Sequence, residues 1–132
     1  MPETIKFWVS GEPVGQGSMR HIGGGRMIAS NQKALKAWRE AIASAAREVT
    51  DLKFDSAVKI KVTFWVSRRP RDKKDEYPVH PYDLDKLCRA VGDAVSIECD
   101  LVANDSQIVE WLATKRFTNV GEPGVEITVT EM

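Results

Sequence analysis

The stretch that most constrains this fold is Pro81-Tyr82-Asp83-Leu84-Asp85-Lys86-Leu87, which carries the signals of a helix start. Pro81 disfavours helical backbone in the residue before it, and Asp83 is a good N-cap residue. Apolar residues then recur at helical spacing, at Leu84, Leu87, Cys88, Val91, Ala94 and Val95. Side chains two residues apart diverge in mid-helix but can converge where an extended segment enters a helix. The sequence therefore predicts a helix from about residue 84 to 97, with Asp83 and Asp85 at its mouth.

Outward from this helix, periodic patterns predict the other elements. Alternating apolar residues predict a strand over 58–66, and β-branched and aromatic residues predict a first strand over 4–9. Two more strands are expected at 108–117 and 124–130, joined as a long-loop hairpin, and Ser30 or Asn31 can cap a helix that runs to Val49. We therefore expect a single α+β domain, residues 1–132, with a mixed sheet of about four or more strands and two main helices packed on one face.

Composition is ordinary for a soluble domain. The 132 residues are 42% hydrophobic and 29% charged, which suits one domain with a real core. No run approaches the roughly 18 apolar residues of a membrane span. No signal peptide is recognised, so a cytoplasmic protein without a membrane partner is expected. The cysteines are Cys88 and Cys99, and no zinc-ligand spacing accompanies them; Cys88 is expected to be a buried small apolar residue.

The net charge is zero, but the charges are unevenly distributed. Residues 1–82 carry 15 Lys/Arg and 9 Asp/Glu, a balance of +6, whereas residues 83–132 carry 4 and 10, a balance of −6. Acids gathered near a metal site, with bases elsewhere, suit a polyanionic partner such as DNA. Two solvated faces of different charge would give the same pattern, so charge alone does not decide between the two interpretations.

Candidate DNA-binding residues are basic and lie mostly in segments expected to be exposed loops. Residues 11–29 are glycine-rich but lack the phosphate-binding motifs, so no nucleotide cofactor is expected, and we interpret them as a mobile loop. Residues 68–76 hold five bases and three acids and lead into the aspartate element. The candidates are Arg20, Arg26, Arg68, Arg69, Arg71, Lys73, Lys74 and Lys86. They would contact phosphates and position the protein on its substrate, although simple solvation is the alternative.

A second acidic element, Asn104-Asp105-Ser106-Gln107-Ile108, lies between the predicted helix and the next predicted strand. Together the two elements resemble the signature of the RusA family of Holliday junction resolvases, in which Asp-x-Asp-Asn-Leu opens a helix and Asp-Asp-(Ser/Ala)-Gln-Val precedes a strand. The resemblance follows most of the chain in order and length. Three positions depart from the family pattern. Lys86 replaces the usual Asn, Asn104 replaces an acidic residue, and Tyr82 occupies a position that is often basic.

The resemblance implies a structure-selective endodeoxyribonuclease that resolves Holliday junctions by paired symmetric nicks in DNA recombination and repair. It implies that Asp83, Asp85 and Asp105 are catalytic and bind Mg²⁺, which takes oxygen ligands and for which Mn²⁺ could substitute. Arg89 corresponds to a frequent lysine of the family and is expected to aid catalysis by orienting a phosphate, with pairing to Asp85 and Asp93 as the alternative. Because a four-way junction has approximate two-fold symmetry, a homodimer bound to branched DNA is also implied.

Ordinary structural roles remain open for the same residues. Asp83 could serve only as a cap, Asp85 as a first-turn acid and Asp105 as a turn residue. Glu110 and Lys115 are five apart on a predicted strand and point to opposite faces, so we interpret both as ordinary strand residues. Two other functions also stay open. One is a junction-binding or branched-DNA-binding protein with weak or no cleavage, and the other is an α+β protein that does not bind nucleic acid.

Overall fold

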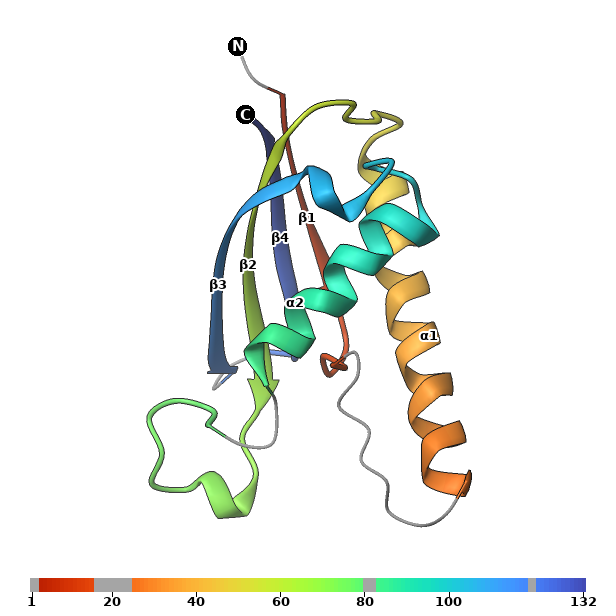
Figure 1. Ribbon diagram of the computed structural model, residues 1–132. Helices are drawn as coiled ribbons and strands as arrows, with labels where there is room; N and C mark the ends of the chain where they lie inside the picture. The colour runs from red at the N-terminus through yellow and green to blue at the C-terminus, as the bar shows by residue number, and fades with distance from the viewer. Residues whose placement is uncertain (1–2, 16–24, 80–82, 119–120) are drawn as a thin grey trace.

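A computed structural model describes residues 3–15, 25–79, 83–118 and 121–132, with side chains in the first helix described from residue 32 onward. These residues form a four-stranded sheet with both long helices against one face (Figure 1). The elements are β1 (Thr4–Ser10), α1 (Gly25–Val49), β2 (Val58–Ser67), α2 (Leu84–Asp93), β3 (Ile108–Thr118) and β4 (Gly124–Glu131). Short helical turns cover Pro70–Asp72, Ala94–Glu98 and Asp105–Gln107. The predicted α+β class and the placement of the helices on one face are confirmed.

The strand order is β1-β4-β2-β3, with β4 antiparallel to both of its neighbours and β3 parallel to β2. The predicted hairpin between the last two strands is therefore wrong, since β2 separates them. Val125, Ile127 and Val129 of β4 are fully buried, which suits a strand with a neighbour on each side. Many residues of β3 are exposed, which suits a strand at the edge of the sheet. The parallel pair needs a crossover connection, which α2 provides.

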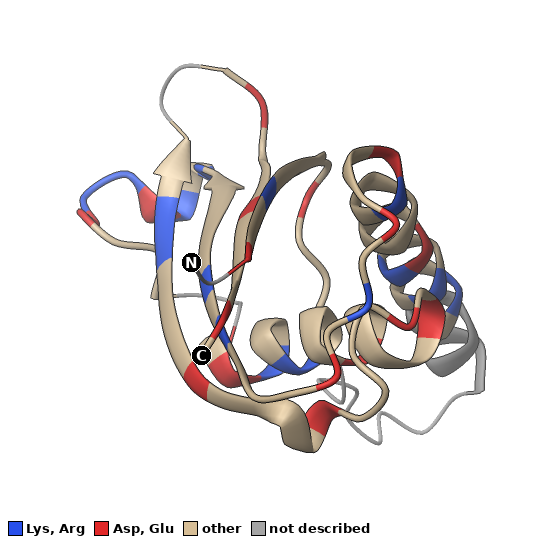
Figure 2. Ribbon diagram, turned by 90° about the horizontal axis from the view of Figure 1, so that it is seen from above, with Lys and Arg blue, Asp and Glu red and all other residues tan. Residues whose placement is uncertain are grey.

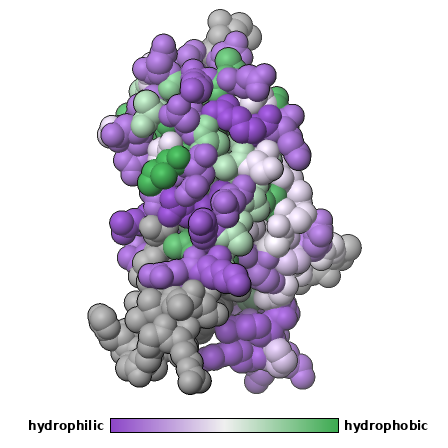
Figure 3. Space-filling model, turned by 90° about the vertical axis from the view of Figure 1, so that its right-hand side faces the viewer, coloured by the Kyte–Doolittle hydropathy of each residue, from purple (hydrophilic) through white to green (hydrophobic). Residues whose placement is uncertain are grey.

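One face of the sheet packs against the helices and forms the core. Alternate residues of β2, from Val58 to Val66, are buried, as the alternating pattern predicted. Trp38 and Ile42 of α1, and Leu87 and Val91 of α2, complete the same cluster. Seen from the side on which α1 lies, the surface is mainly hydrophilic with scattered apolar patches (Figure 3), as expected for the solvent side of an amphipathic helix.

Two helix boundaries differ from the sequence prediction. The first helix begins at Gly25 instead of residue 30 or 31, so Arg26 lies in α1 and not in the preceding loop. Residues 26–29 contain no helix breaker, and the helix continues toward the N-terminus through them. At its other end Val49 is 53% exposed and lies outside the core. No helix among the residues described here combines the length and apolar character that a membrane span needs.

The predicted helix over 84–97 is confirmed, but its last turn is a π-helix over Ala94–Glu98. The backbone N–H groups of Leu101 and Val102 both donate to the carbonyl of Val95, which satisfies an acceptor at the helix end. The chain then crosses to the Asp105 turn and enters β3. This route carries the second acidic element back to the edge of the sheet beside α2.

Candidate active site

Asp83 is the N-cap residue of α2, and its backbone is extended, with φ −87° and ψ 123°. Its carbonyl accepts a hydrogen bond from the Leu87 N–H at 3.1 Å, so the backbone performs the capping function. The carboxylate, by contrast, makes no cap hydrogen bond to the helix and lies exposed. Asp83 is thus the N-cap residue through its backbone, whereas its charged group has no part in capping.

Asp85 lies in the first turn of α2, and its side chain is 77% exposed. The Lys86 ammonium group lies 3.5 Å from Asp85 Oδ2, with 34% of the Lys86 side chain exposed. The departure from the family pattern at Lys86 thus places a cation beside one presumed metal ligand. The helix dipole adds a second, weaker attraction for negative charge at this end of α2. Lys86, predicted to bind DNA, is therefore engaged with Asp85 in this structure.

The turn that carries Asp105 is closed by hydrogen bonds from the residues around it. Asn104 Oδ1 accepts from the Ser106 N–H at 2.9 Å. Gln107 Oε1 accepts from the N–H groups of Ala103 at 2.9 Å and Asn104 at 3.1 Å. Both side chains form a reciprocal capping box, a role for which Asn and Asp are about equally suited. The Asn at position 104 is therefore explained as a cap.

Gln107 also fastens this turn to the segment before β2. Its Nε2 donates to the carbonyl oxygens of Phe54 and Ser56, each at 2.9 Å. The Phe54 N–H donates to Leu101 at 2.7 Å, and Phe54 forms a parallel bridge with Val102. The amide of one side chain thus satisfies four backbone groups. Asp105 consequently projects from a turn with little freedom to move.

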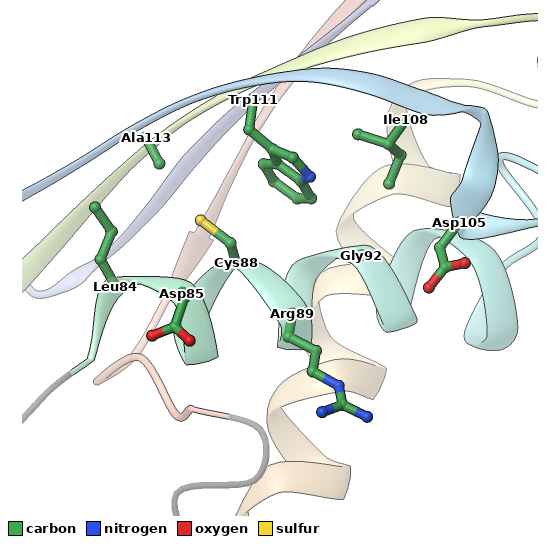
Figure 4. A pocket seen from close by; sticks show the side chains of 9 residues that line it. All are labelled: Leu84, Asp85, Cys88, Arg89, Gly92, Asp105, Ile108, Trp111 and Ala113. Carbon is green, nitrogen blue, oxygen red and sulfur yellow. The ribbon is translucent and has the colours of Figure 1, made fainter.

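A pocket of about 640 Å³ lies between α2 and β3 and connects the two acidic elements. Its lining is formed by Leu84, Asp85, Cys88, Arg89, Gly92, Asp105, Ile108, Trp111 and Ala113. Figure 4 shows Asp85 near one end of this pocket and Asp105 near the other, with Arg89 between them along the helix. Apolar side chains form much of the wall, and few polar groups converge on it, as is usual for a ligand-binding cleft.

The three presumed metal ligands do not meet in one chain. Within residues 3–15, 25–79, 83–118 and 121–132, no group of three or more His, Cys, Asp or Glu side chains is arranged to hold a metal ion. Asp83 and Asp85 lie at the start of α2. Asp105 belongs to the turn before β3, and Figure 4 shows it at the end of the pocket opposite Asp85. The assignment of all three aspartates to one ion therefore stays a prediction.

Arg89 and Cys88 have different roles in the pocket wall. Arg89 is exposed, and no ion pair joins it to Asp85 or Asp93 in the described structure, so its guanidinium group remains available to a phosphate. Cys88 is partly buried, as part of the apolar wall, and burial together with the nearby Asp85 charge raises the pKa of Cys88 to about 11. The thiol is therefore neutral near pH 7 and is a poor metal ligand.

The basic loop, residues 68–76, leaves the sheet at the same end as the start of α2 (Figure 1), and it mixes Lys and Arg with Asp and Glu (Figure 2). The Arg68 guanidinium group stacks 4.0 Å from the centroid of Phe117 and donates to the carbonyls of Asp72 at 2.8 Å and Asp75 at 2.7 Å. Arg69 donates to both carboxylate oxygens of Asp72, at 2.9 and 3.0 Å. These two arginines therefore hold the loop itself together.

Asp72 is the buried anchor of this loop, with 1% of its surface exposed. The side-chain hydrogen bond from Arg69 is the main cause that lowers the pKa of Asp72 to about 2. The remaining bases of the loop, Arg71, Lys73 and Lys74, are exposed and can reach phosphates. Among the other predicted DNA contacts, Arg20 lies outside the described residues, and Arg26 lies in α1 with no described side chain.

Lys115, predicted to be an ordinary strand residue, lies on the face of β3 that is turned toward the helices. It pairs with Phe64 and faces the helices, whereas Glu110 pairs with Lys59 on the other face, so the predicted opposite orientation is correct. Burial lowers the pKa of Lys115, and the charge of Asp83 opposes that effect. The sequence does mark Lys115 as unusual. Trp111, Ala113 and Phe117 alternate with it and predict an apolar face, on which a lysine is unexpected.

Two comparisons bear on identity. The family model described as endodeoxyribonuclease RusA matches residues 10–130, nearly the whole chain. No curated protein matches the sequence. The matched range includes both acidic elements, the basic loop, the pocket, β2, β3 and nearly all of β4, whereas β1 lies before it except for Ser10.

Proposed function

Because the chain belongs to the RusA family of endodeoxyribonucleases, we propose that it resolves Holliday junctions by paired symmetric nicks, acting as a Mg²⁺-dependent homodimer. The observation that carries the proposal is the pair of exposed carboxylates at the start of α2. Asp83 and Asp85 present exposed carboxylates there, and the Asp83 carboxylate is not used to cap the helix. Two exposed carboxylates beside a pocket, one of them not used in capping, are more readily explained by a ligand than by stability.

The donor set suits Mg²⁺ and its substitute Mn²⁺, which are hard cations that take carboxylate oxygens and keep several waters. Asp83 and Asp85 would hold the ion, and substrate phosphate oxygens would complete much of its coordination. Asp105 is the third proposed ligand. Since the isolated chain does not gather all three carboxylates, we propose that Asp105 joins the others in the assembled complex of two subunits and DNA.

The reaction is hydrolysis of a phosphodiester. Water adds to phosphorus as the bond to the 3′ oxygen breaks, which leaves a 5′-phosphate and a 3′-hydroxyl. Bound Mg²⁺ would supply polarisation of the scissile phosphate, help with deprotonation of the water and charge neutralisation at the departing oxygen. Arg89 would orient the phosphate through two parallel hydrogen bonds, and Arg71, Lys73 and Lys74 would contact neighbouring phosphates.

The homodimer follows from the substrate. A four-way junction has approximate two-fold symmetry, and two nicks at equivalent positions require two equivalent active sites. Each subunit would supply one copy of the α2 mouth and one basic loop. Sedimentation of the protein alone and with a junction would test this part, with a single-subunit complex as the contradicting result.

A junction-binding protein with weak or no cleavage is the second candidate. The observation in its favour is the Lys86 ammonium group 3.5 Å from Asp85. A fixed cation at this position competes with a metal ion for the same carboxylate. In that case the protein would bind junctions tightly and cleave them slowly.

A synthetic mobile four-way junction separates these functions. The purified protein would be incubated with the junction in Mg²⁺ or EDTA, beside an Asp85→Asn variant and a matched Asp51→Asn control at an exposed position after α1. We expect symmetric nicks that disappear with EDTA and in Asp85→Asn, and that persist in Asp51→Asn. Tight binding without nicks would favour the second candidate. Failure to bind junction or duplex DNA would contradict both.

A further inference from the structure

Lys115 occupies a position on β3 that is otherwise apolar. Ala113 lines the pocket on one side of it, and Phe117 is 5% exposed on the other. All three residues face the helices, because they pair with Val62, Phe64 and Val66, which are buried in the core. A charged group in such a row loses part of its hydration, which costs free energy that an apolar residue at the same position would not lose.

The course of β3 past α2 directs Lys115 toward the proposed active site. In Figure 4, Ile108 lies near Gly92, and Ala113 lies beside Leu84, so strand and helix run in opposite directions. The next residue on this face is Lys115, and the residue before Leu84 is Asp83. The electrostatic interaction between Asp83 and Lys115 agrees with this placement.

The surroundings place Lys115 between two parts of the proposed DNA-binding surface. On one side lies the pocket with Asp85 and Arg89. On the other side, the Arg68 guanidinium group covers the Phe117 ring and ties the basic loop to the end of β3. A phosphate that reaches Asp83 from the basic loop would therefore pass Lys115.

We propose that Lys115 is a catalytic residue of the Asp83–Asp85 site, whose ammonium group contacts a non-bridging oxygen of the scissile phosphate. This inference rests on the proposed function. Negative charge grows on the phosphate oxygens in the transition state, and a cation already fixed in place stabilises it with little reorganisation. Lys115 meets that condition because it projects from a strand of the sheet and is partly buried. The lysines of the exposed loop are less constrained.

Lys115 also has a predictable effect on the metal. A cation beside Asp83 repels a divalent ion held by the same carboxylate. Removal of the Lys115 charge should therefore lower the maximal cleavage rate and at the same time tighten metal binding. A loss of local structure would have a different effect, since it would lower both the cleavage rate and the affinity for the metal.

The test compares Lys115→Met, which keeps the apolar stem, with Lys115→Arg and with a control, Lys61→Met, on the exposed face of β2. The measurements are single-turnover junction cleavage at saturating Mg²⁺, junction binding in EDTA, Mn²⁺ affinity by calorimetry, and thermal melting. For Lys115→Met we expect cleavage at least about 100-fold slower, because a fixed transition-state contact is lost. Mn²⁺ binding should be tighter than in the wild type, Lys115→Arg should recover part of the rate, and Lys61→Met should match the wild type.

Several results would overturn the inference. Cleavage by Lys115→Met within a few fold of wild type would remove the catalytic role, while the proposed function would stand. Slower cleavage with weaker Mn²⁺ binding, a lower melting temperature and no recovery in Lys115→Arg would assign Lys115 a structural role only. If the wild type itself does not cleave junctions, the proposed function fails first. Unchanged Mn²⁺ affinity in Lys115→Met would then also refute the placement of its charge beside Asp83.

Discussion

The two acidic elements of this protein are held in opposite ways. At the mouth of α2, Asp83 and Asp85 are exposed, and the Asp83 carboxylate makes no bond to the helix. In the turn before β3, Asn104 and Gln107 fix the backbone around Asp105 with a capping box and two bonds to the segment before β2. The proposed site therefore combines a fixed reference point with carboxylates that can adapt to a metal and a phosphate.

The largest expected effect is on the cleavage rate, from a change to the exposed carboxylates at the start of α2. Asp83→Asn should slow junction cleavage at least about 1000-fold, since loss of a metal ligand removes several kcal/mol of transition-state stabilisation. The melting temperature should stay close to that of the wild type, because Asn is an equally good N-cap residue and the Asp83 carboxylate does not cap α2. A clear loss of stability in this variant would show that the carboxylate does hold the helix.

Gln107→Ala tests the fixed side of the comparison. We expect a loss of about 1–3 kcal/mol in the free energy of unfolding, because four backbone groups, one of them part-buried, lose their hydrogen bonds to the Gln107 side chain. Cleavage should fall by about 10–100-fold, the usual effect of removing a group that orients a ligand. Chemical denaturation and single-turnover cleavage would measure the two effects. Gln32→Ala, at an exposed position of α1, is the matched control. Full activity in Gln107→Ala would mean that Asp105 does not depend on its turn.

Lys86→Asn should have a smaller effect, and in the favourable direction. An exposed ion pair contributes less than about 1 kcal/mol, so its removal should lower the Mg²⁺ concentration for half-maximal cleavage by no more than about fivefold. A titration of Mg²⁺ in the cleavage assay would show the shift, with Lys36→Asn on α1 as the control. A slower maximal rate in Lys86→Asn would instead identify Lys86 as a substrate contact.

The smallest effect concerns the basic loop beside the helix mouth. The folded-state pKa of Asp72, about 2, lies below its ordinary value of 3.8. The Arg69–Asp72 interaction therefore stabilises the loop fully above pH 3.8 and is lost as the pH falls through about 2. NMR spectra recorded between pH 5 and 2 should show loop resonances that change only near the lower limit. A loop transition near pH 4 would contradict the assigned interaction.

The sequence predicted the parts of this fold that depend on local pattern. Alternating residues such as Ile60 and Val62 identify β2, and the spacing from Leu84 to Val95 identifies α2, because both patterns repeat within one element. The position of β4 between β1 and β2 was not predicted, because neighbouring strands are chosen by contacts distant in sequence. The turn-rich linker after β3 favoured a hairpin locally, but β4 instead pairs with β1 on one edge and with β2 on the other.

In the candidate site, too, local features were predicted and contacts between distant elements were not. The mouth of α2 was predicted from Asp83 and the helical spacing after it, since an N-cap is a local feature. The stacking of Arg68 on the Phe117 ring could not be predicted, because it depends on where β3 places Phe117. The spacing of Glu110 and Lys115 along one strand predicts no shared site, whereas the residue whose charge acts on Lys115, Asp83, comes from another element. Contacts between residues of different elements leave no local pattern in the sequence.

The parallel pairing of β2 with β3 has a kinetic consequence. The basic loop, α2 and the Asp105 turn all lie in the single connection between these strands. That connection must close before the strands can pair, and non-local closure of this kind is slow. Because β3 is an edge strand, its detachment would dismantle every part of the proposed site in one event. Bound metal and DNA should therefore slow amide hydrogen exchange in β3 more than in β1, which lies at the other edge of the sheet.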